Sequence, residues 1–355
     1  MTRSAPVPTN ADLYGLRVRR LQGAEAAPIA VPACIVCGDT ASRPRFAVEG
    51  VSAPVVVCEK CGLGRFHPMP SAEEVSALYP DEYYGEPGVK FQSLVERLVR
   101  IVAARHVAFL SGGLAPGARV LDVGCGRGVI LGPLADRGLE VHGVEISAEA
   151  ARGVDARARV RIAPRLADAG YDDAYFDEVI VWHVLEHLPD PAGTLAEIAR
   201  ILRPGGRVIV AVPNFESAQA RWMGPAWFHL DLPRHLYQFP ASGLCALLEG
   251  SGFEVVSEHH FSLRQNPFGW IQSALNCMPG LPRNGLYTVL HERGRGEAPP
   301  YAASTRLLLW SLLLLLTPAA LAATLLSTLA RSGATVHVVA RRRGTSATTA
   351  ASSRP

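Results

Sequence analysis

Residues 119–130 read R-V-L-D-V-G-C-G-R-G-V-I, an apolar run that ends in three closely spaced glycines. Such a run is typical of a buried parallel strand that turns into a helix. Glycine permits positive φ and lets a ligand approach the backbone. The spacing is G-x-G-x-G, and Val129 stands where the dinucleotide fingerprint needs its last glycine. Asp122, just before the loop, instead favours a ligand that carries positive charge.

A second apolar run, residues 139–144, ends in Glu145, about 20 residues after the glycine loop. In nucleotide-binding α/β folds, an acidic residue at this position accepts hydrogen bonds from the hydroxyls of the ribose. Here the chain resembles the class I S-adenosylmethionine-dependent methyltransferases, whose cofactor carries an ammonium and a sulfonium. Glu145 matches the family's ribose-binding acid. The resemblance implies that the first motif binds the cofactor through Asp122, Gly124, Cys125, Gly126 and Gly128.

The composition indicates a folded protein of one large domain with additions, or of two domains. The chain has 355 residues, of which 48% are hydrophobic and 19% charged, and its net charge is +3. That charge is too small to indicate a nucleic-acid partner. The N-terminus lacks the apolar core of a secretory signal, so we expect the seven cysteines to stay reduced in the cytosol. Residues 1–30 are expected to form a flexible arm.

Two C-x-x-C pairs, Cys34/Cys37 and Cys58/Cys61, are separated by about 20 residues. This spacing is typical of a zinc ribbon, and four thiolates would form a closed, structural site. A redox pair is the other interpretation, although a redox motif would not need a second pair. We place the ribbon at residues 31–75.

The ribbon has two possible roles. An RNA-binding surface should be clearly basic, but acids match or outnumber bases in residues 31–81, so no nucleic-acid partner is expected. The sequence that follows the second C-x-x-C pair resembles the ribbon-to-linker region of bacterial sugar and polysaccharide-pathway methyltransferases. That resemblance implies a ribbon that lies beside the active site and helps to shape the substrate pocket.

The resemblance implies a Rossmann-like α/β sheet of seven strands, the last of them antiparallel. We place this domain at residues 76–262 plus 334–343. After the first two strands, the remaining five are expected at residues 160–162, 179–182, 207–212, 253–261 and 334–340. Asp168, which comes late after the third strand, is a candidate contact for the adenine.

The string H-x-x-E-H follows the fourth strand, at the ligand side of an open α/β sheet. His183 is the residue that we expect most firmly in the pocket, near the methionine end of the cofactor and in a catalytic role. The string also matches a metalloprotease pattern. We reject that interpretation because the string follows a strand in a cofactor-binding fold and the sequence suggests no third ligand. His187 is equally well explained as a structural residue.

Residues 227–237 read W-F-H-L-D-L-P-R-H-L-Y and follow the fifth strand, on the expected substrate side. Polar residues that exchange protons make this loop a candidate acceptor site. We predict that His235 is the general base, that Arg234 contacts an anionic substrate group, and that Tyr237 contacts the substrate. The alternative for Arg234 is a purely structural ion pair with Asp231.

An apolar insertion, residues 263–333, separates the sixth and seventh strands. Residues 307–330 are uncharged, between Arg306 and Arg331, and are long enough to span a bilayer. A single crossing would put the seventh strand on the wrong side, and Pro318 stands near the centre. We therefore expect a bent, monotopic or re-entrant anchor on the cytoplasmic face of the membrane. The alternative is a soluble apolar hairpin in a dimer or under a substrate lid. Residues 344–355 are expected to be disordered.

The sequence thus predicts a membrane-associated methyltransferase that uses S-adenosylmethionine and structural zinc. The expected acceptor is a hydroxyl, or a carbon beside a carbonyl, on a sugar or lipid-linked intermediate. Three alternatives stay open: a quinone or small-lipid O-methyltransferase, a ribosomal RNA methyltransferase, and a non-catalytic scaffold. The acceptor atom, the pathway and the oligomeric state cannot be deduced from the sequence.

Overall fold

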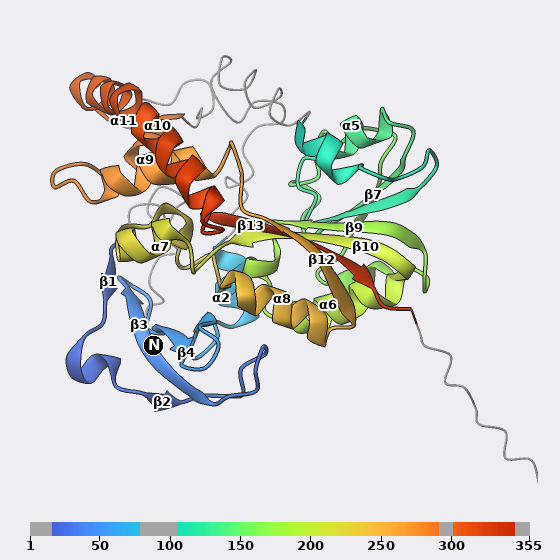
Figure 1. The fold of residues 1–355 in the computed structure, drawn as a ribbon, viewed down its shortest axis with the longest axis horizontal. Coiled ribbons are helices and arrows are strands. Elements are labelled where there is room, and N and C mark those ends of the chain that lie inside the picture. Colours follow the sequence, from blue (N-terminus) through green and yellow to red (C-terminus); the bar gives the residue numbers. More distant parts are fainter. Residues whose placement is uncertain (1–15, 79–104, 291–300, 345–355) are drawn as a thin grey trace, which may run out of the picture.

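A twisted sheet of seven strands forms the centre of the molecule (Figure 1). The computed structural model describes residues 16–78, 105–290 and 301–344. The order of the strands across the sheet is β12-β13-β10-β9-β6-β7-β8. Their bounds are β6 (Arg119–Val123), β7 (Glu140–Glu145), β8 (Arg159–Ile162), β9 (Phe176–Trp182), β10 (Leu202–Pro213), β12 (Phe253–His259) and β13 (Thr335–Arg342).

The antiparallel strand of this sheet is β13, which lies between β10 and β12 and runs opposite to both. β6 pairs in parallel with both β7 and β9. The middle strands are buried on both faces, which is why they read as continuous apolar runs; Val208, Ile209 and Val210 of β10 have no exposed surface. The predicted seven-stranded methyltransferase sheet is confirmed.

Helices cover both faces of the sheet. On one face, the helix at residues 105–110 and α5 (Leu131–Ala135) share an apolar core with Ile180 and Ile209. On the other lie α6 (Pro191–Ile201) and α8 (Ala241–Gly250) (Figure 1). The Asp190 side chain caps α6 by accepting a hydrogen bond from the Gly193 amide. The apolar core beneath α6 and α8 continues into the N-terminal sheet, where it includes Phe46 and Phe66.

The N-terminal ribbon is larger than its four cysteines indicate. Its sheet begins with β1 (Val18–Arg20) and β2 (Ile29–Ala30), which both pair with β3 (Ala41–Val48), followed by β4 (Val55–Cys58) and β5 (Gly64–Phe66). The flexible arm predicted for residues 1–30 is therefore wrong from residue 16 onward. The backbone of this segment finds its hydrogen-bond partners on the edge of β3, which the sequence alone does not reveal. Residues 1–15 lie outside the described part.

A sixth strand of the ribbon sheet comes from the catalytic domain. β11 (Tyr237–Gln238) pairs antiparallel with β5, with Tyr237 opposite Arg65 and Gln238 opposite Gly64. A Cβ atom at position 64 would lie 2.8 Å from the Gln238 side chain, so the close approach requires glycine there. The loop predicted to hold the acceptor therefore ends as part of the ribbon.

The insertion between β12 and β13 is helical. Its described helices are α9 (Asn266–Asn276), α10 (Gly285–Leu290) and α11 (Ala303–Leu329), which pack together around Trp270, Leu286 and Leu309. The predicted hairpin at Pro318 is wrong, because α11 continues through this residue as one helix. Proline removes only one hydrogen bond of the ladder, and strong helix formers flank it on both sides.

Candidate functional site

The glycine loop leaves β6 in a conformation that other residues rarely adopt. Gly124, Gly126 and Gly128 have φ values of 68°, 49° and 66°. A Cβ atom at Gly124 would lie 2.6 Å from Val184, and one at Gly128 would lie 2.8 Å from Val154. The loop thus has no room for side chains where it packs, and Val184 brings the segment after β9 against it.

Two carboxylates lie at the ends of adjacent strands beside this loop. Glu145 at the end of β7 accepts hydrogen bonds of 2.8 Å from the amides of Gly126 and Ile146. Asp122 of β6 is buried, and burial, followed by the charge of Glu145, raises its pKa to about 8. Ile146 next to them is 57% exposed. This end of the sheet offers negative charge, bare backbone and one open apolar side chain.

His183 follows β9 with a φ of 55°, a left-handed conformation that is strained for histidine. Its Nδ1 lies 3.2 Å from Oε1 of Glu186. An ionised carboxylate only accepts, so this contact needs a proton on Nδ1, and in that tautomer of the neutral ring Nε2 is the acceptor. Among the described residues Nε2 has no partner, although it is enclosed. The strained backbone therefore holds an imidazole with one free acceptor nitrogen beside the glycine loop.

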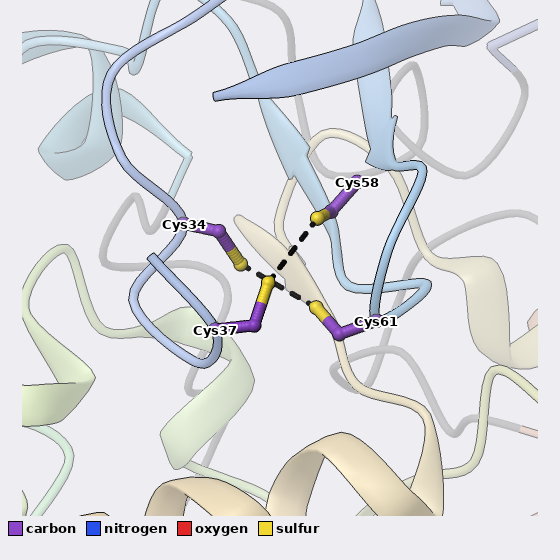
Figure 2. A group of neighbouring side chains, drawn as sticks. All are labelled: Cys34, Cys37, Cys58 and Cys61. Carbon is purple, nitrogen blue, oxygen red and sulfur yellow. Dashed lines mark hydrogen bonds between the residues drawn. The ribbon is translucent and has the colours of Figure 1, made fainter. Parts of the chain in front are cut away.

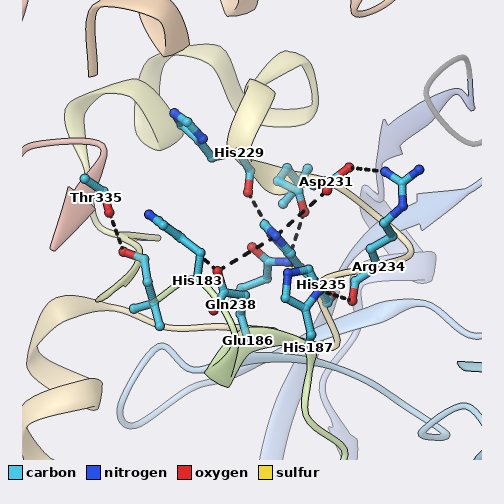
Figure 3. Close-up of polar contacts among 11 residues, drawn as sticks. His183, Glu186, His187, His229, Asp231, Arg234, His235, Gln238 and Thr335 are labelled. Atoms are coloured by element: carbon cyan, nitrogen blue, oxygen red, sulfur yellow. Dashed lines mark hydrogen bonds and ion pairs between the residues drawn. The ribbon is translucent and has the colours of Figure 1, made fainter. Parts of the chain in front are cut away.

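Glu186 is the centre of a histidine cluster, which we define as His183, His187, His229 and His235 (Figure 3). Its side chain is 1% exposed, against 19% for His183. Burial alone would raise the pKa of Glu186, but the hydrogen bond from His183 and the nearby histidines hold the pKa below its usual value. The carboxylate is therefore charged, and it orients the ring of His183.

His235 is enclosed on all sides in this cluster. Its Nδ1 donates to the carbonyl of His229 at 3.0 Å, and its Nε2 lies 4.0 Å from Oε1 of Glu186. Burial, together with His187, holds the pKa of His235 well below its usual value, and burial lowers the pKa of His229 to about 4. Both imidazoles are therefore neutral near pH 7.

Glu186, His187 and His235 also offer three metal-ligand atoms that all lie within 4.8 Å of one another. The sequence suggested no third ligand for the H-x-x-E-H string, and the structure supplies His235 from a different loop. Backbone carbonyls already engage the Nδ1 atoms of His187 and His235. A metal would therefore bind these rings through Nε2.

The four cysteines of the two C-x-x-C pairs meet in the ribbon (Figure 2). The Sγ atoms of Cys34 and Cys61 are 3.5 Å apart, and those of Cys37 and Cys58 are 3.6 Å apart. Four sulfurs bound tetrahedrally at about 2.3 Å from zinc would lie about 3.8 Å apart. The cluster therefore fits a structural zinc ion.

Comparisons with known proteins agree with this geometry. Residues 95–258 match a family described as "Methyltransferase domain". A ubiquinone biosynthesis O-methyltransferase of Alkalilimnicola ehrlichii is 41% identical over 118 residues, which cover 31% of this chain and 47% of the relative. The enzyme of the same name from Aeromonas salmonicida is 31% identical over 175 residues, which cover 44% of this chain and 72% of the relative.

This chain belongs to the class I S-adenosylmethionine-dependent methyltransferases. Similar solved structures include the [4+2]-cyclase SpnF, with 19% identity, a TM-score of 0.48 and coverage of 77% of this chain and 97% of the other. A 1,6-didemethyltoxoflavin-N1-methyltransferase of Burkholderia thailandensis has 17% identity, a TM-score of 0.43 and coverage of 83% and 98%.

The predicted cofactor residues of this methyltransferase fall into two groups. Asp122, the loop glycines, Cys125 and Glu145 lie together, and His183 lies next to them through Val184. Asp168 lies in a short 3-10 helix after β8 and pairs with Arg165 at 2.7 Å. Its contact with adenine stays a prediction.

The predicted substrate residues of the methyltransferase lie in protein-filled surroundings. The Arg234 side chain is 1% exposed, and its Nη1 lies 3.2 Å from Asp231, which is the structural pairing left open above. The Tyr237 hydroxyl donates to the carbonyl of Pro189 at 3.4 Å. Their roles toward a substrate stay predictions, and both side chains hold the acceptor loop in place.

Sequence reasoning gave no role to two residues that the structure of the methyltransferase brings forward. Glu186 stands three residues after His183, a spacing that lets one turn join both side chains. That spacing could have indicated the pairing of the two side chains. No feature of the sequence indicates that Ile146 is exposed, because an exposed and a buried isoleucine look the same in sequence.

We expect cofactor affinity to depend on pH through Asp122. In the ligand-free protein its raised pKa keeps the carboxyl neutral up to about pH 8, whereas a cationic ligand favours the ionised form. Below pH 8, binding should therefore release a proton, and affinity should rise by up to about tenfold per pH unit. Calorimetry between pH 6.5 and 8.5, in buffers of different ionisation enthalpy, measures this. The Asp122→Asn variant should show no such proton release.

Removal of zinc should impair the acceptor site more than the cofactor site. β5, which follows Cys61 directly, pairs with β11, so loosening the ribbon frees the loop that carries His235. For a Cys58→Ser variant we expect at least a tenfold loss of methyl transfer, with the dissociation constant for S-adenosylhomocysteine within threefold of wild type. Metal content and near-ultraviolet circular dichroism provide readouts besides activity. Equal losses of cofactor binding and turnover would contradict this coupling.

Proposed function

We propose that this methyltransferase transfers a methyl group to a hydroxyl oxygen of a small lipid-linked acceptor. The bound cofactor supplies a methyl carbon activated by its sulfonium. The observation that carries the proposal is the His183–Glu186 pair, which offers an imidazole lone pair next to the cofactor loop. A hydroxyl acceptor needs such a base, because its proton must leave as the new bond forms.

The residues of the site would divide the work as follows. A cofactor held by the glycine loop and Glu145 would supply the activated methyl group, and Nε2 of His183 would accept the proton that the acceptor hydroxyl loses. Glu186 stabilises the imidazolium that results, because its charge lies 3.2 Å from Nδ1. His235, which is neutral and buried, acts behind this pair by filling the space beside Glu186.

The aromatic side chains next to His183 support an uncharged acceptor. Trp182 lies between His106 and His337, with ring centroids 3.8 Å and 4.4 Å away. Burial lowers the pKa of His106 to about 4 and that of His337 well below its usual value, so neither ring offers charge to a phosphate. Surroundings of neutral rings favour an uncharged acceptor over a phosphate.

Two acceptor classes satisfy these requirements. The zinc ribbon and its linker resemble sugar-pathway enzymes, which favours a lipid-linked sugar hydroxyl. The relatives compared above are named for ubiquinone biosynthesis, which favours a phenolic hydroxyl on a polyprenyl chain as a second candidate. Both acceptors would be neutral where they react.

The test is a methyl-transfer assay with purified protein and cofactor labelled in the methyl group. Extracted lipid-linked sugars, prenylated dihydroxybenzoates, nucleotide sugars and ribosomal RNA are offered separately, and mass spectrometry locates the label. Label on a hydroxyl oxygen of a lipid-linked compound supports the proposal. Label on carbon, on RNA or on no acceptor overturns it.

A further inference from the structure

α11 presents one apolar face to the outside of the molecule. Leucines on this face are between 46% and 74% exposed: Leu307, Leu308, Leu314, Leu315, Leu321, Leu325, Leu326 and Leu329. The opposite face packs on α9 and α10, with Leu309, Ala320, Thr324 and Ser327 buried. Eight exposed leucines on one helix far exceed the scattered apolar residues of an ordinary protein surface. Figure 1 shows α11 at the edge of the molecule, away from the sheet.

The charged residues of the described insertion itself are basic. In residues 263–290 and 301–333 the charged side chains are Arg264, Arg283, Arg306 and Arg331, and the sequence of these segments has no acid. Arg306 and Arg331 flank the uncharged stretch at its two ends, and the largely exposed Arg331 also pairs with Glu258 of β12 at 3.3 Å. Cationic residues at the ends of an apolar surface complement anionic lipid headgroups.

Both halves of α11 are attached to the same folded body. Near its start, Leu309 packs in one cluster with Leu286 of α10. At its end, the backbone carbonyl of Ser332 accepts a hydrogen bond from the amide of Ala218, and its side chain accepts one from Arg221, before the chain enters β13. α11 has the length and composition of a membrane-spanning helix. A crossing would nevertheless separate one of these attachments from the sheet.

We propose that α11 lies in the plane of an anionic membrane, with its leucine face in the boundary between headgroups and acyl chains. This inference rests on the proposed function and names the partner surface on which the lipid-linked acceptor is found. A helix in this orientation buries its outer face in lipid while its inner face stays packed on α9.

The same arrangement brings the membrane close to the histidine cluster. α9 packs on α11 and also on the loop of the acceptor site. Ser273 of α9 accepts a hydrogen bond of 2.9 Å from the amide of Phe228, and the carbonyl of Gln265 lies 3.3 Å from Nε2 of His229. One helix therefore separates the lipid surface from the residues around Glu186.

Flotation of the full chain with vesicles tests this orientation. Vesicles of phosphatidylglycerol and phosphatidylethanolamine are compared with vesicles of phosphatidylcholine. Wild-type protein should float with the anionic vesicles, and a Leu314→Glu/Leu325→Glu variant should lose binding at least tenfold. Val256→Glu is the matched control, because Val256 is 53% exposed on β12, away from α11, and this variant should float like wild type. Unchanged binding of S-adenosylhomocysteine shows that each variant is folded.

Two results would overturn the inference. The first is flotation of the double variant at the wild-type level. The second is wild-type protein that binds no vesicles but is a dimer in solution, which the double variant converts to a monomer; a second copy would then cover the face. A water-soluble acceptor analogue separates this inference from the proposed function. Vesicle binding without methylation of any lipid-linked or soluble hydroxyl would refute the function and leave the membrane orientation supported.

Discussion

His183→Ala is expected to lower kcat for methyl transfer by about 10²- to 10⁴-fold, the usual contribution of a positioned general base. The affinity for S-adenosylhomocysteine should stay within threefold of wild type, because the glycine loop and Glu145 are untouched. Alanine also relieves little of the backbone strain at φ 55°, so a thermal-melting measurement accompanies the kinetics. Steady-state kinetics with the acceptor that the labelling assay identifies give the comparison.

Glu186→Gln separates a base from a merely structural cluster. Glutamine can still accept the hydrogen bond from Nδ1 of His183, but it offers no charge to the imidazolium. The acid limb of the kcat/KM profile should therefore move to lower pH, and kcat should fall by at least about tenfold.

His235→Asn is the comparison that could reverse this assignment. If it abolishes turnover while His183→Ala does not, His235 is the base, as the sequence first indicated. Loss of wild-type activity on chelation, with the ribbon metal retained, would instead assign Glu186, His187 and His235 to a catalytic metal.

Glu145→Gln is expected to raise the dissociation constant for S-adenosylhomocysteine by about 100-fold. A carboxylate that binds both ribose hydroxyls makes two charge-assisted hydrogen bonds. Its replacement by an amide lowers the binding free energy by about 1.5 kcal/mol for each bond, or about 3 kcal/mol in all. The substitution also weakens the bond that Glu145 accepts from the Gly126 amide, so the loop itself becomes less ordered.

Calorimetry with Glu140→Gln as the control tests this expectation. Glu140 is the first residue of the same strand, β7, at the end of the strand opposite to Glu145 and the glycine loop. Its ion pairs with Arg119 and Arg159 lie near the surface and contribute little to stability. The control should bind the ligand like wild type. A threefold or smaller effect of Glu145→Gln would place the ribose elsewhere.

The central sheet could be predicted from the sequence because its signals are local. Each buried strand is a short apolar run, and Gly124, Gly126 and Gly128 mark a turn whose φ values exclude other residues. The pairing of β13 with β10, which lies far from it in the sequence, could be predicted only from the resemblance to a family. The pairing of Val18–Arg20 with β3 had no local signal, since an edge strand needs only a free neighbour.

The acceptor side was harder to predict because burial decides the roles of its residues. His183 and His235 both stand in polar loops of the sequence, yet Nε2 of His183 has no partner among the described residues, whereas both ring nitrogens of His235 face protein groups. Arg234 is similarly enclosed. A guanidinium in a loop suggests an anion contact, and only the fold shows that Asp231 lies 3.2 Å away. The unbroken course of α11 through Pro318 is accompanied by packing against α9 and α10, which composition cannot convey.

The pairing of β11 with β5 has a consequence for how this enzyme can be shortened or recombined. A truncated protein that starts after residue 75 would keep every predicted cofactor residue but leave Tyr237 and Gln238 without the strand they pair with. We therefore expect the shortened protein to bind the cofactor and to lose methyl transfer. For the same reason, an exchange of N-terminal modules between homologues would carry acceptor preference with it, because the incoming module would reset the path of the loop that ends at Gln238.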